Sequence, residues 1–250
     1  MKVVILGSGG WIPTKNSETC SYLVALENDL VILDTGTGIA NLGQHQNLIE
    51  SYNTVNVIYS HYHLDHIIGF SYLIPWFGSK KIIFYGPGEP YYKGGVKEVL
   101  KIITAPAFHS VPIEEMAKEV SFIDYGINGF TVGGSAIGIN QQMHTSPSFG
   151  INIDNKLHYA TDTTVMDETF KYADSANILL HECWDLTKVK DSLHSSAEEI
   201  ICFAQKHESV KIGLMHKNPL WTNEQLEQLR AMIEGYNIFI AEDAMVIDVN

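Results

Sequence analysis

The sequence predicts a mixed α/β protein, and three observations lead to that class. Short apolar runs recur along the chain, and most are rich in the β-branched and aromatic residues that favour strands. Segments with helical character lie between and after these runs. Hydrophobic residues make up 45% of the 250 residues and charged residues 18%, as in an ordinary globular protein. This length suits one large domain or two halves sharing a core, and no linker, repeat or low-complexity tract divides the chain.

The first part of the chain contains five apolar runs that predict strands. They cover residues 3–6, 21–26, 30–33, 54–59 and 81–85. Glycines 7, 9 and 10 follow the first run and would permit a dinucleotide-binding loop, but the third glycine of that fingerprint is missing and no clear helix follows. Residues 89–120 are predicted to be helical and irregular. Their aromatic residues Tyr91, Tyr92 and Phe108 suit a substrate lid, and they suit an ordinary packing helix at least as well.

The second part alternates predicted strands with two predicted helices. The strands cover residues 133–143, 156–160, 178–180 and 210–215. One helix is expected over residues 194–207, with Ser195 or Ser196 as its N-cap and carboxylates in its first turn. The other is expected over residues 223–235.

Charge and cysteine content exclude several classes of protein. No apolar run reaches the roughly 20 residues that span a bilayer, and the N-terminus is typical of a strand, so we expect a cytoplasmic protein with no membrane partner. Three widely spaced cysteines suit a reducing compartment. The net charge of −13 argues against nucleic acid as the main partner. Arg230 is the single arginine, so metal ions, lysines or backbone N–H groups must hold any anion.

The most informative stretch is a cluster of metal-binding residue types just after the strand at 54–59. It reads His61-Tyr-His63-Leu-Asp65-His66. Imidazole nitrogens and carboxylate oxygens are the donors that zinc takes at about 2.0–2.2 Å. Residues two apart in an extended turn can face one ion, as His61 and His63 would, which leaves Asp65 and His66 for a second ion. A polar surface loop rich in histidine is the alternative, but four such residues after a buried strand favour a metal site.

Other predicted strands also end at residues that can bind a metal. These are His144, Asp162 and His216. Each alone would be an ordinary solvated histidine or turn residue, but strand ends far apart in sequence can meet at one edge of a fold. Asp34 ends the strand at 30–33, where it could be a turn residue or could brace a metal-binding histidine from behind.

These motifs together resemble the metallo-β-lactamase superfamily over nearly the whole chain. The His-x-His-x-Asp-His motif is highly specific for that superfamily. Ala160-Thr-Asp-Thr-Thr164, Leu180-His-Glu182 and His194-Ser-Ser-Ala are similar to its ribonuclease Z and phosphodiesterase-like branch. The resemblance implies a four-layer αββα sandwich, with residues 1–250 forming a single hydrolase domain.

The same resemblance implies a binuclear centre with seven ligands. It assigns His61, His63 and His144 to one ion, Asp65, His66 and His216 to the other, and Asp162 to both. The implied cofactors are two divalent metal ions, with zinc preferred, although manganese and iron also suit His/Asp sites. The remaining histidines match no ligand position and are expected to be structural or solvent-facing: His45, His109, His158, His181 and His207.

The implied activity is hydrolysis of a small or flexible phosphodiester by a metal-activated hydroxide. Asp65 would bind metal and orient or deprotonate the attacking water. His194, steered by Glu182, would protonate the departing oxygen. The alternatives are that His194 caps the end of the helix and that Glu182 is only a charged residue at the end of a strand.

Two departures weaken a tRNA-processing interpretation. Residues 86–130 lack the long glycine-proline arm of ribonuclease Z, and Lys217-Asn-Pro219 stands where that family has Ser and Arg-Tyr. The alternatives to a small phosphodiesterase are a hydrolase of carboxylic esters, thioesters or lactams, a tRNA 3′-processing endonuclease and a non-catalytic metal-binding protein. A homodimer is kept open as a partner.

Overall fold

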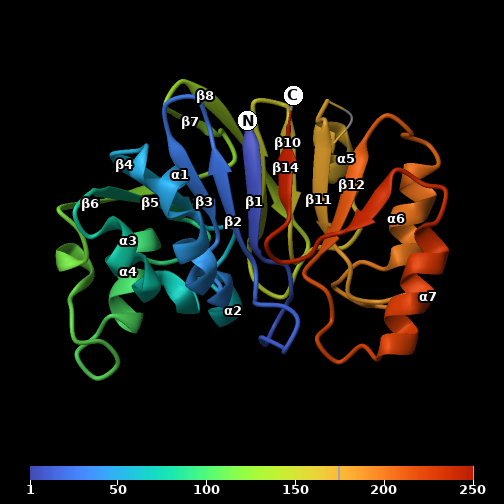
Figure 1. The fold of residues 1–250 in the computed structure, drawn as a ribbon, viewed down its shortest axis with the longest axis horizontal. Coiled ribbons are helices and arrows are strands. Elements are labelled where there is room, and N and C mark those ends of the chain that lie inside the picture. Colours follow the sequence, from blue (N-terminus) through green and yellow to red (C-terminus); the bar gives the residue numbers. More distant parts are fainter. Residues whose placement is uncertain (174, 250) are drawn as a thin grey trace.

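The computed structural model describes residues 1–173 and 175–249. Two β-sheets lie face to face in the middle, and helices cover the outer face of each sheet (Figure 1). The four layers confirm the α/β class and the αββα sandwich that the sequence predicts. Both chain ends lie at the same end of the sandwich, and the short helix α2 (Leu64–Ile67) lies at the opposite end (Figure 1).

The first sheet carries the N-terminal half of the chain and one strand from the C-terminus. Its order is β14 (Val246–Asp248), β1 (Lys2–Gly7), β2 (Ser21–Ala25), β3 (Leu30–Leu33), β4 (Thr54–Ile58), β5 (Lys81–Pro87) and β6 (Glu119–Tyr125). Pairing is antiparallel from β14 to β3 and parallel from β3 to β6. The carboxyl ends of β3, β4 and β5 therefore meet at one edge.

The second sheet has a similar mixed pattern. Its order is β13 (Ile238–Ile240), β12 (Lys211–Met215), β11 (Ile178–Glu182), β10 (Leu157–Ala160), β9 (Ser148–Ile153), β8 (Ser135–Gln142) and β7 (Phe130–Val132). The four strands from β10 to β13 are parallel, and the remaining pairs are antiparallel. The carboxyl ends of β10, β11 and β12 thus share an edge as well.

Helices form the outer layers on both sides (Figure 1). Beside the first sheet are η1 (Thr37–His45), α1 (Gln46–Glu50), α2, η2 (Ile68–Leu73), α3 (Ile74–Phe77), α4 (Gly95–Ile103) and η3 (Ile113–Glu115). Beside the second are α5 (Asp167–Ala173), α6 (Ala197–Ala204) and α7 (Asn223–Ile233). Among the described residues, no helix has the length and apolar character needed to cross a membrane.

The core between the sheets is apolar and joins both halves of the chain. Tyr22 from β2 and Tyr159 from β10 are fully buried there, with ring centroids 5.2 Å apart. Separate apolar clusters lie between each sheet and its own helices. Burial on both faces explains why the strands read as continuous hydrophobic runs in the sequence.

The predicted strands are present with ends shifted by one or two residues, but five strands were not predicted. These are β6, β7, β9, β13 and β14. The irregular helical prediction for residues 89–120 holds for α4 and η3, whereas β6 begins at Glu119. No helix follows the glycines after β1, which argues against the dinucleotide-binding loop. Cys20, Cys183 and Cys202 form no disulfide.

The two predicted helices are confirmed and are shorter than expected. Ser196, one of the two candidate caps, starts α6 with a capping box, in which its side chain accepts from the N–H of Glu199 and the Glu199 carboxylate accepts in return. Thr222 and Gln225 form the same reciprocal pair at the start of α7.

Candidate metal centre

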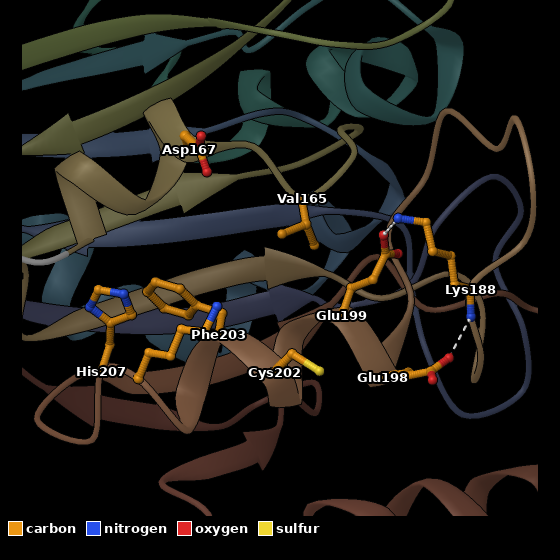
Figure 2. A pocket seen from close by; sticks show the side chains of 9 residues that line it. Val165, Asp167, Lys188, Glu198, Glu199, Cys202, Phe203 and His207 are labelled. Carbon is orange, nitrogen blue, oxygen red and sulfur yellow. Dashed lines mark hydrogen bonds and ion pairs between the residues drawn. The ribbon is translucent and has the colours of Figure 1, made fainter.

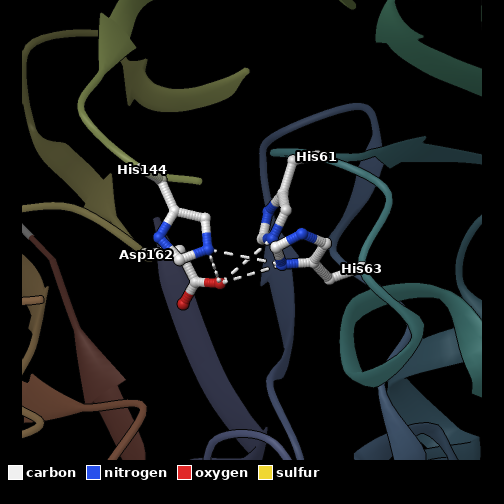
Figure 3. A group of neighbouring side chains, drawn as sticks. All are labelled: His61, His63, His144 and Asp162. Atoms are coloured by element: carbon white, nitrogen blue, oxygen red, sulfur yellow. Dashed lines mark hydrogen bonds and ion pairs between the residues drawn. The ribbon is translucent and has the colours of Figure 1, made fainter. Parts of the chain in front are cut away.

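The seven predicted ligands lie at the strand ends that meet at one edge of the sandwich. His61 and His63 follow β4, and Asp65 and His66 lie on α2, which starts one residue later. The other three follow strands of the second sheet: His144 after β8, Asp162 after β10 and His216 after β12. Figure 3 shows His61, His63, His144 and Asp162 pointing toward a common position from both sheets.

Three imidazole nitrogens converge on one oxygen of Asp162. Its Oδ2 lies 3.0 Å from Nε2 of His61, 3.4 Å from Nε2 of His144 and 3.8 Å from Nδ1 of His63. Nδ1 of His63 and Nε2 of His144 are themselves 3.3 Å apart. A tetrahedral ion with bonds of about 2.0–2.1 Å holds its donors about 3.3–3.4 Å apart, so this spacing fits a metal ion.

A second group of donors lies on the other side of Asp162. Oδ2 of Asp65 is 3.4 Å from Nε2 of His66 and 3.3 Å from Nε2 of His216. Asp162 reaches this group as well, because its Oδ1 lies 2.9 Å from Nε2 of His216 and its Oδ2 lies 3.5 Å from Nε2 of His66. Asp162 therefore contacts both groups of donors.

Hydrogen bonding provides an independent test of whether these residues fit a divalent ion. Nε2 of His61, Nε2 of His66 and Oδ1 of Asp162 are buried, and none makes a hydrogen bond with the described residues. Buried polar atoms without partners are rare in folded proteins. Because all three face the points where the donors converge, the clusters can bind a divalent metal ion.

The opposite nitrogens of two histidines are fixed from behind through Asp34. Nδ1 of His66 lies 2.8 Å from Oδ2 of Asp34, and Ser60 donates its hydroxyl to the same oxygen at 2.7 Å. The Ser60 oxygen is then free to accept from Nδ1 of His61 at 3.0 Å. Asp34 is fully buried, and Tyr159 from the second sheet also donates to it at 2.7 Å. Both histidines thus keep the Nε2 lone pair toward the centre.

The other two histidines of the first group have partners that sequence reasoning missed. Nε2 of His63 lies 3.0 Å from the hydroxyl of Ser146, and Nδ1 of His144 lies 3.5 Å from the carbonyl of Leu193. Ser146 follows His144 by two residues in an irregular loop, so only the fold brings it to His63. In the sequence, the signal for this partner was that Ser146 lies two residues after the candidate ligand His144.

Comparison with known proteins identifies the family. The family model of the metallo-beta-lactamase superfamily matches residues 18–148, which is more than half of the chain. The chain belongs to the metallo-β-lactamase superfamily. A second model, described as anti-Pycsar protein Apyc1, matches residues 105–234, again more than half, so the chain also belongs to the family that this model describes.

Individual relatives agree with this placement. A ribonuclease Z from Azobacteroides pseudotrichonymphae is 24% identical over 293 residues, covering 99% of this chain and 98% of the relative. That alignment exceeds 250 positions, so the relative has segments for which this chain has no counterpart. With its metallo-β-lactamase membership and this relative, the chain is a metal-dependent hydrolase.

Solved structures with the same fold are more distant in sequence. The metallo-β-lactamase fold protein YhfI from Bacillus subtilis has a TM-score of 0.75 and 20% identity, covering 98% of each chain. A diphosphatase of the PhnP family has a TM-score of 0.73 and 16% identity, covering 100% of this chain and 98% of that one. Yeast PDE1 has a TM-score of 0.68 and 14% identity over 98% of each.

In this metallo-β-lactamase-superfamily hydrolase, His194 and Glu182 form a pair beside the second group of donors. Nδ1 of His194 lies 2.8 Å from Oε2 of Glu182, which is fully buried. Because a carboxylate only accepts, Nδ1 carries the hydrogen and Nε2 remains free. Trp184 stacks on the His194 ring with centroids 4.9 Å apart and planes at 24°. Donor atoms of Glu182, His194, Asp162 and His216 lie within 4.8 Å of one another.

Charges within the centre favour the binding of a cation. Burial alone would lower the pKa of His66 and His216, but neighbouring carboxylates, Asp65 and Asp162 foremost, raise both well above the ordinary value. The same contacts outweigh burial at Asp65 and hold its pKa well below the usual range. Burial lowers the pKa of His144 to about 4, so this imidazole is neutral at pH 7. A divalent ion would take the place of the protons that these carboxylates stabilise on His66 and His216.

The five histidines predicted to lie outside the centre are all absent from these groups of donors. His158 and His181 are fully buried on β10 and β11, as expected for structural residues. His109 contacts the backbone of Val111, and His207 stacks on a phenylalanine of α6.

A separate cavity of about 430 Å³ lies beside α6 (Figure 2). Its walls include Val165, Lys188, Glu199 and Cys202, and Lys188 forms an ion pair with Glu199 across it. None of the seven candidate ligands lines this cavity, so it is distinct from the candidate metal centre.

The segment considered as a substrate lid contacts residues that neighbour the candidate ligands in sequence. Tyr92 donates its hydroxyl to the carbonyl of Pro147, and its ring contacts that of Tyr62 at 4.7 Å. Tyr91 packs on Phe149 in the core, whereas Phe108 is exposed. Tyr92 therefore links residues 86–130 to the loop that carries Ser146.

Proposed function

We propose that this hydrolase holds two divalent metal ions and cleaves small phosphodiesters. The observation that carries the proposal is the convergence of seven side chains, with Asp162 between the other six and donor atoms spaced 2.9–3.8 Å apart. One ion would be held by His61, His63 and His144 and the other by Asp65, His66 and His216, with Asp162 on both. Zinc suits these nitrogen and oxygen donors, and manganese and iron are alternatives. The whole chain, residues 1–250, would form a single domain.

Divalent ions bound there would supply Lewis acidity to the phosphoryl group and lower the pKa of the attacking water. The side chain of Asp65 is mostly buried, and the backbone N–H of Trp11 donates to its Oδ2 at 2.8 Å. Its low pKa keeps it a carboxylate at neutral pH. Asp65 would therefore orient the attacking water as a hydrogen-bond acceptor.

His194 is proposed as the group that protonates the departing oxygen. Burial lowers its pKa, but the hydrogen bond and charge of Glu182 more than compensate, so the pKa of His194 is raised above its ordinary value. About a quarter of its side chain is exposed, so a substrate at the centre can reach Nε2. Glu182 and Trp184 would hold the imidazole in the plane that proton transfer requires.

The preference for a small substrate follows from charge and from the length of the chain. A net charge of −13 opposes the approach of a nucleic-acid backbone. The ribonuclease Z relative has segments without counterparts in this chain, in line with the missing arm. The PhnP-family diphosphatase and yeast PDE1 have this fold, although such distant likeness supports the architecture alone.

The experiment compares reaction classes on one preparation. Purified protein should contain close to two divalent ions per chain and hydrolyse bis(4-nitrophenyl) phosphate faster than a 4-nitrophenyl ester or a thioester. The Asp162→Ala variant should lose at least one ion and nearly all turnover. Faster cleavage of the ester or thioester would favour the alternative hydrolase class. Absence of turnover of every substrate by fully loaded protein would favour a non-catalytic metal-binding protein.

The same preparation tests the tRNA-processing alternative. Linear and cyclic small phosphodiesters should be cleaved in preference to a precursor tRNA. Efficient cleavage of the precursor at its 3′ end, falling steeply as salt rises, would contradict the proposal and support the activity that the ribonuclease Z relatives are named for.

The match to the Apyc1 model supports one biological role for this hydrolysis. That model is described as an anti-Pycsar protein, so we propose that this chain acts against the Pycsar system by hydrolysis. Expression beside an active Pycsar system should suppress it, and the Asp162→Ala variant should not. Equal suppression by the wild type and the Asp162→Ala variant would show that this role does not depend on the metal chemistry.

A further inference from the structure

A charged residue outside the seven candidate ligands holds the loop that covers the second group of donors. Lys217 directly follows His216 and is half-buried. Its ammonium donates to the hydroxyl of Ser8 at 3.1 Å, to the carbonyl of Ser8 at 3.5 Å and to the carbonyl of Ala241. The lysine thus joins the end of β12 to the residue after β1.

Asp243 holds the same serine from another side. Its Oδ1 accepts from the Ser8 backbone N–H at 2.9 Å and from the Ser8 hydroxyl at 2.8 Å. Its Oδ2 accepts from the N–H of Glu18 at 2.7 Å. A cation and an anion therefore fix Ser8, and hydrogen bonds to charged groups are stronger than neutral ones.

The loop Ser8–Trp11 connects these contacts to the second group of donors. Gly9 forms a bridge with Lys217, and the N–H of Gly10 donates to the Lys217 carbonyl at 3.2 Å. A Cβ on Gly10 would lie 2.5 Å from the His216 ring, so only glycine lets the backbone cover this imidazole. The next residue, Trp11, donates its N–H to Oδ2 of Asp65. The loop thus sets the surroundings of His216 and Asp65.

Ser8, Gly9 and Gly10 are buried, but packed side chains do not surround this loop on every side. A cavity of about 510 Å³ lies beside it, lined by Ser8, Gly9, Lys217 and Asp243 among others. Trp11 adopts a φ of 61°, a conformation unusual for a bulky residue, and its side chain is 56% exposed. Polar contacts therefore help to hold the backbone conformation. Those of Lys217 and Asp243 are charged contacts from outside the candidate ligands, whereas Asp65, which Trp11 contacts, is itself one of those ligands.

We propose that Lys217 and Asp243 are positioning residues that set the affinity of the second metal ion through the Ser8–Trp11 loop. The inference rests on the proposed binuclear function. None of the contacts found in the described residues joins this loop to His61, His63 or His144. The effect should therefore be confined to the ion held by Asp65, His66 and His216.

The test is a metal titration of the full chain carrying Lys217→Met or Asp243→Asn. Zinc is added to metal-free protein in competition with a chromophoric chelator, which resolves a tighter and a weaker binding step. Loss of a group that supports a metal ligand typically weakens affinity about 10–100-fold. Each variant should show that loss in one step and leave the other within about twofold. The Lys217→Met/Asp243→Asn double variant should lose little more than either single variant, because both act through Ser8.

The matched control is Lys15→Met, which removes another lysine from the wall of the same cavity. It should leave both binding steps unchanged. Equal weakening of both steps in the Lys217 and Asp243 variants, or no change in either, would overturn the proposal. Asp243→Asn preserves the shape of the side chain, so it tests the inference even where Lys217→Met does not fold. Wild-type protein that binds only one zinc ion would instead refute the proposed binuclear function.

Discussion

At the scale of single residues, His194 shows how one contact decides what a side chain can do. The Glu182 carboxylate fixes a hydrogen on Nδ1, which leaves Nε2 available for another partner. Trp184 covers one face of the ring, so the imidazole has little freedom to turn. A histidine held this way suits proton transfer, whereas the seven candidate ligands direct a lone pair or a carboxylate oxygen toward the centre.

The role of His194 predicts a dependence on the leaving group. General-acid catalysis contributes about 10²–10⁴-fold to rate. The His194→Ala variant should lose about that factor with a phosphodiester whose leaving group is an alcohol, and far less with a nitrophenolate, which needs little protonation. Metal content should stay unchanged. Steady-state rates on both substrates, with elemental analysis, measure this.

Controls separate this role from a structural one. The His109→Ala variant removes a histidine outside the centre and should behave as wild type on both substrates. If His194→Ala slows both substrates by the same factor and lowers the melting temperature, His194 is a structural residue.

The candidate ligands were predictable from sequence because their residue types and strand-end positions carry the signal. His61, His63 and Asp65 form a local motif, and the family resemblance supplied the distant members. The groups that support them could not be predicted in the same way. Trp184 and Lys217 have ordinary residue types for their positions, and the fold alone brings them to His194 and to Ser8.

At the scale of secondary structure, the centre depends on strand ends held together by one carboxylate. Asp34 directly follows β3 and has a φ of 54°. It accepts from Ser60 after β4 and contacts His66 on α2. Tyr159 brings β10 of the second sheet to the same group. Asp34 therefore joins the two sheets directly behind the candidate ligands.

This arrangement predicts different outcomes for Asp34→Asn and Tyr159→Phe. The amide of asparagine places donors opposite the donors of Ser60, His66 and Tyr159. The affinity of the ion held through His66 should therefore fall about 10–100-fold, and that of the ion held through His61 should fall as well, because Ser60 orients His61. Tyr159→Phe removes one hydrogen bond to a buried carboxylate and should cost about 1.5–3 kcal/mol of unfolding free energy without changing metal content. Metal titration and denaturant unfolding of both variants measure this. Equal metal affinity in both variants would contradict the role of Asp34.

The strands that sequence predicted and those that it missed differ in a physical way. Those with continuous apolar runs, such as β1 and β3, are buried on both faces and were recognised. In β9 a serine, a glycine and an asparagine interrupt the apolar run, because its outer face meets polar side chains such as Asn140. The strands β13 and β14 have three residues each, too few for a periodic signal.

At the scale of the whole molecule, buried polar groups are concentrated in the second sheet. The inner faces meet in an apolar core, and most of the buried polar side chains on strands lie on β8 to β11. His158 and His181 are fully buried on neighbouring strands, and neither ring nitrogen of His158 has a hydrogen-bond partner among the described residues. Burial lowers the pKa of His158 to about 3 and that of His181 to about 4.

These two histidines predict a loss of stability in acid. Above pH 6.5 each is neutral in both the folded and the unfolded state, so neither adds a pH dependence. Below pH 6.5 each histidine becomes protonated in the unfolded chain. In the folded protein the same histidine stays neutral until the pH reaches its lower folded-state pKa, so stability falls as pH falls. At pH 5 the loss is about 2 kcal/mol for each histidine, from about 1.4 kcal/mol per pH unit.

The His158→Phe variant should remove the contribution of His158 to this loss of stability in acid. Phenylalanine keeps an aromatic ring against Tyr172, on which His158 stacks at 5.5 Å, and has no nitrogen to leave unpaired. Its unfolding free energy relative to wild type should therefore rise by about 2 kcal/mol between pH 7 and pH 5. Denaturant unfolding at both values, at fixed metal concentration, measures this. The control is Tyr159→Phe on the same strand, which neither adds nor removes a group that titrates in acid. Its unfolding free energy should differ from that of the wild type by the same amount at both pH values. If His158→Phe also shows a constant difference, His158 is already protonated or solvated in the folded protein, and the acid sensitivity originates elsewhere.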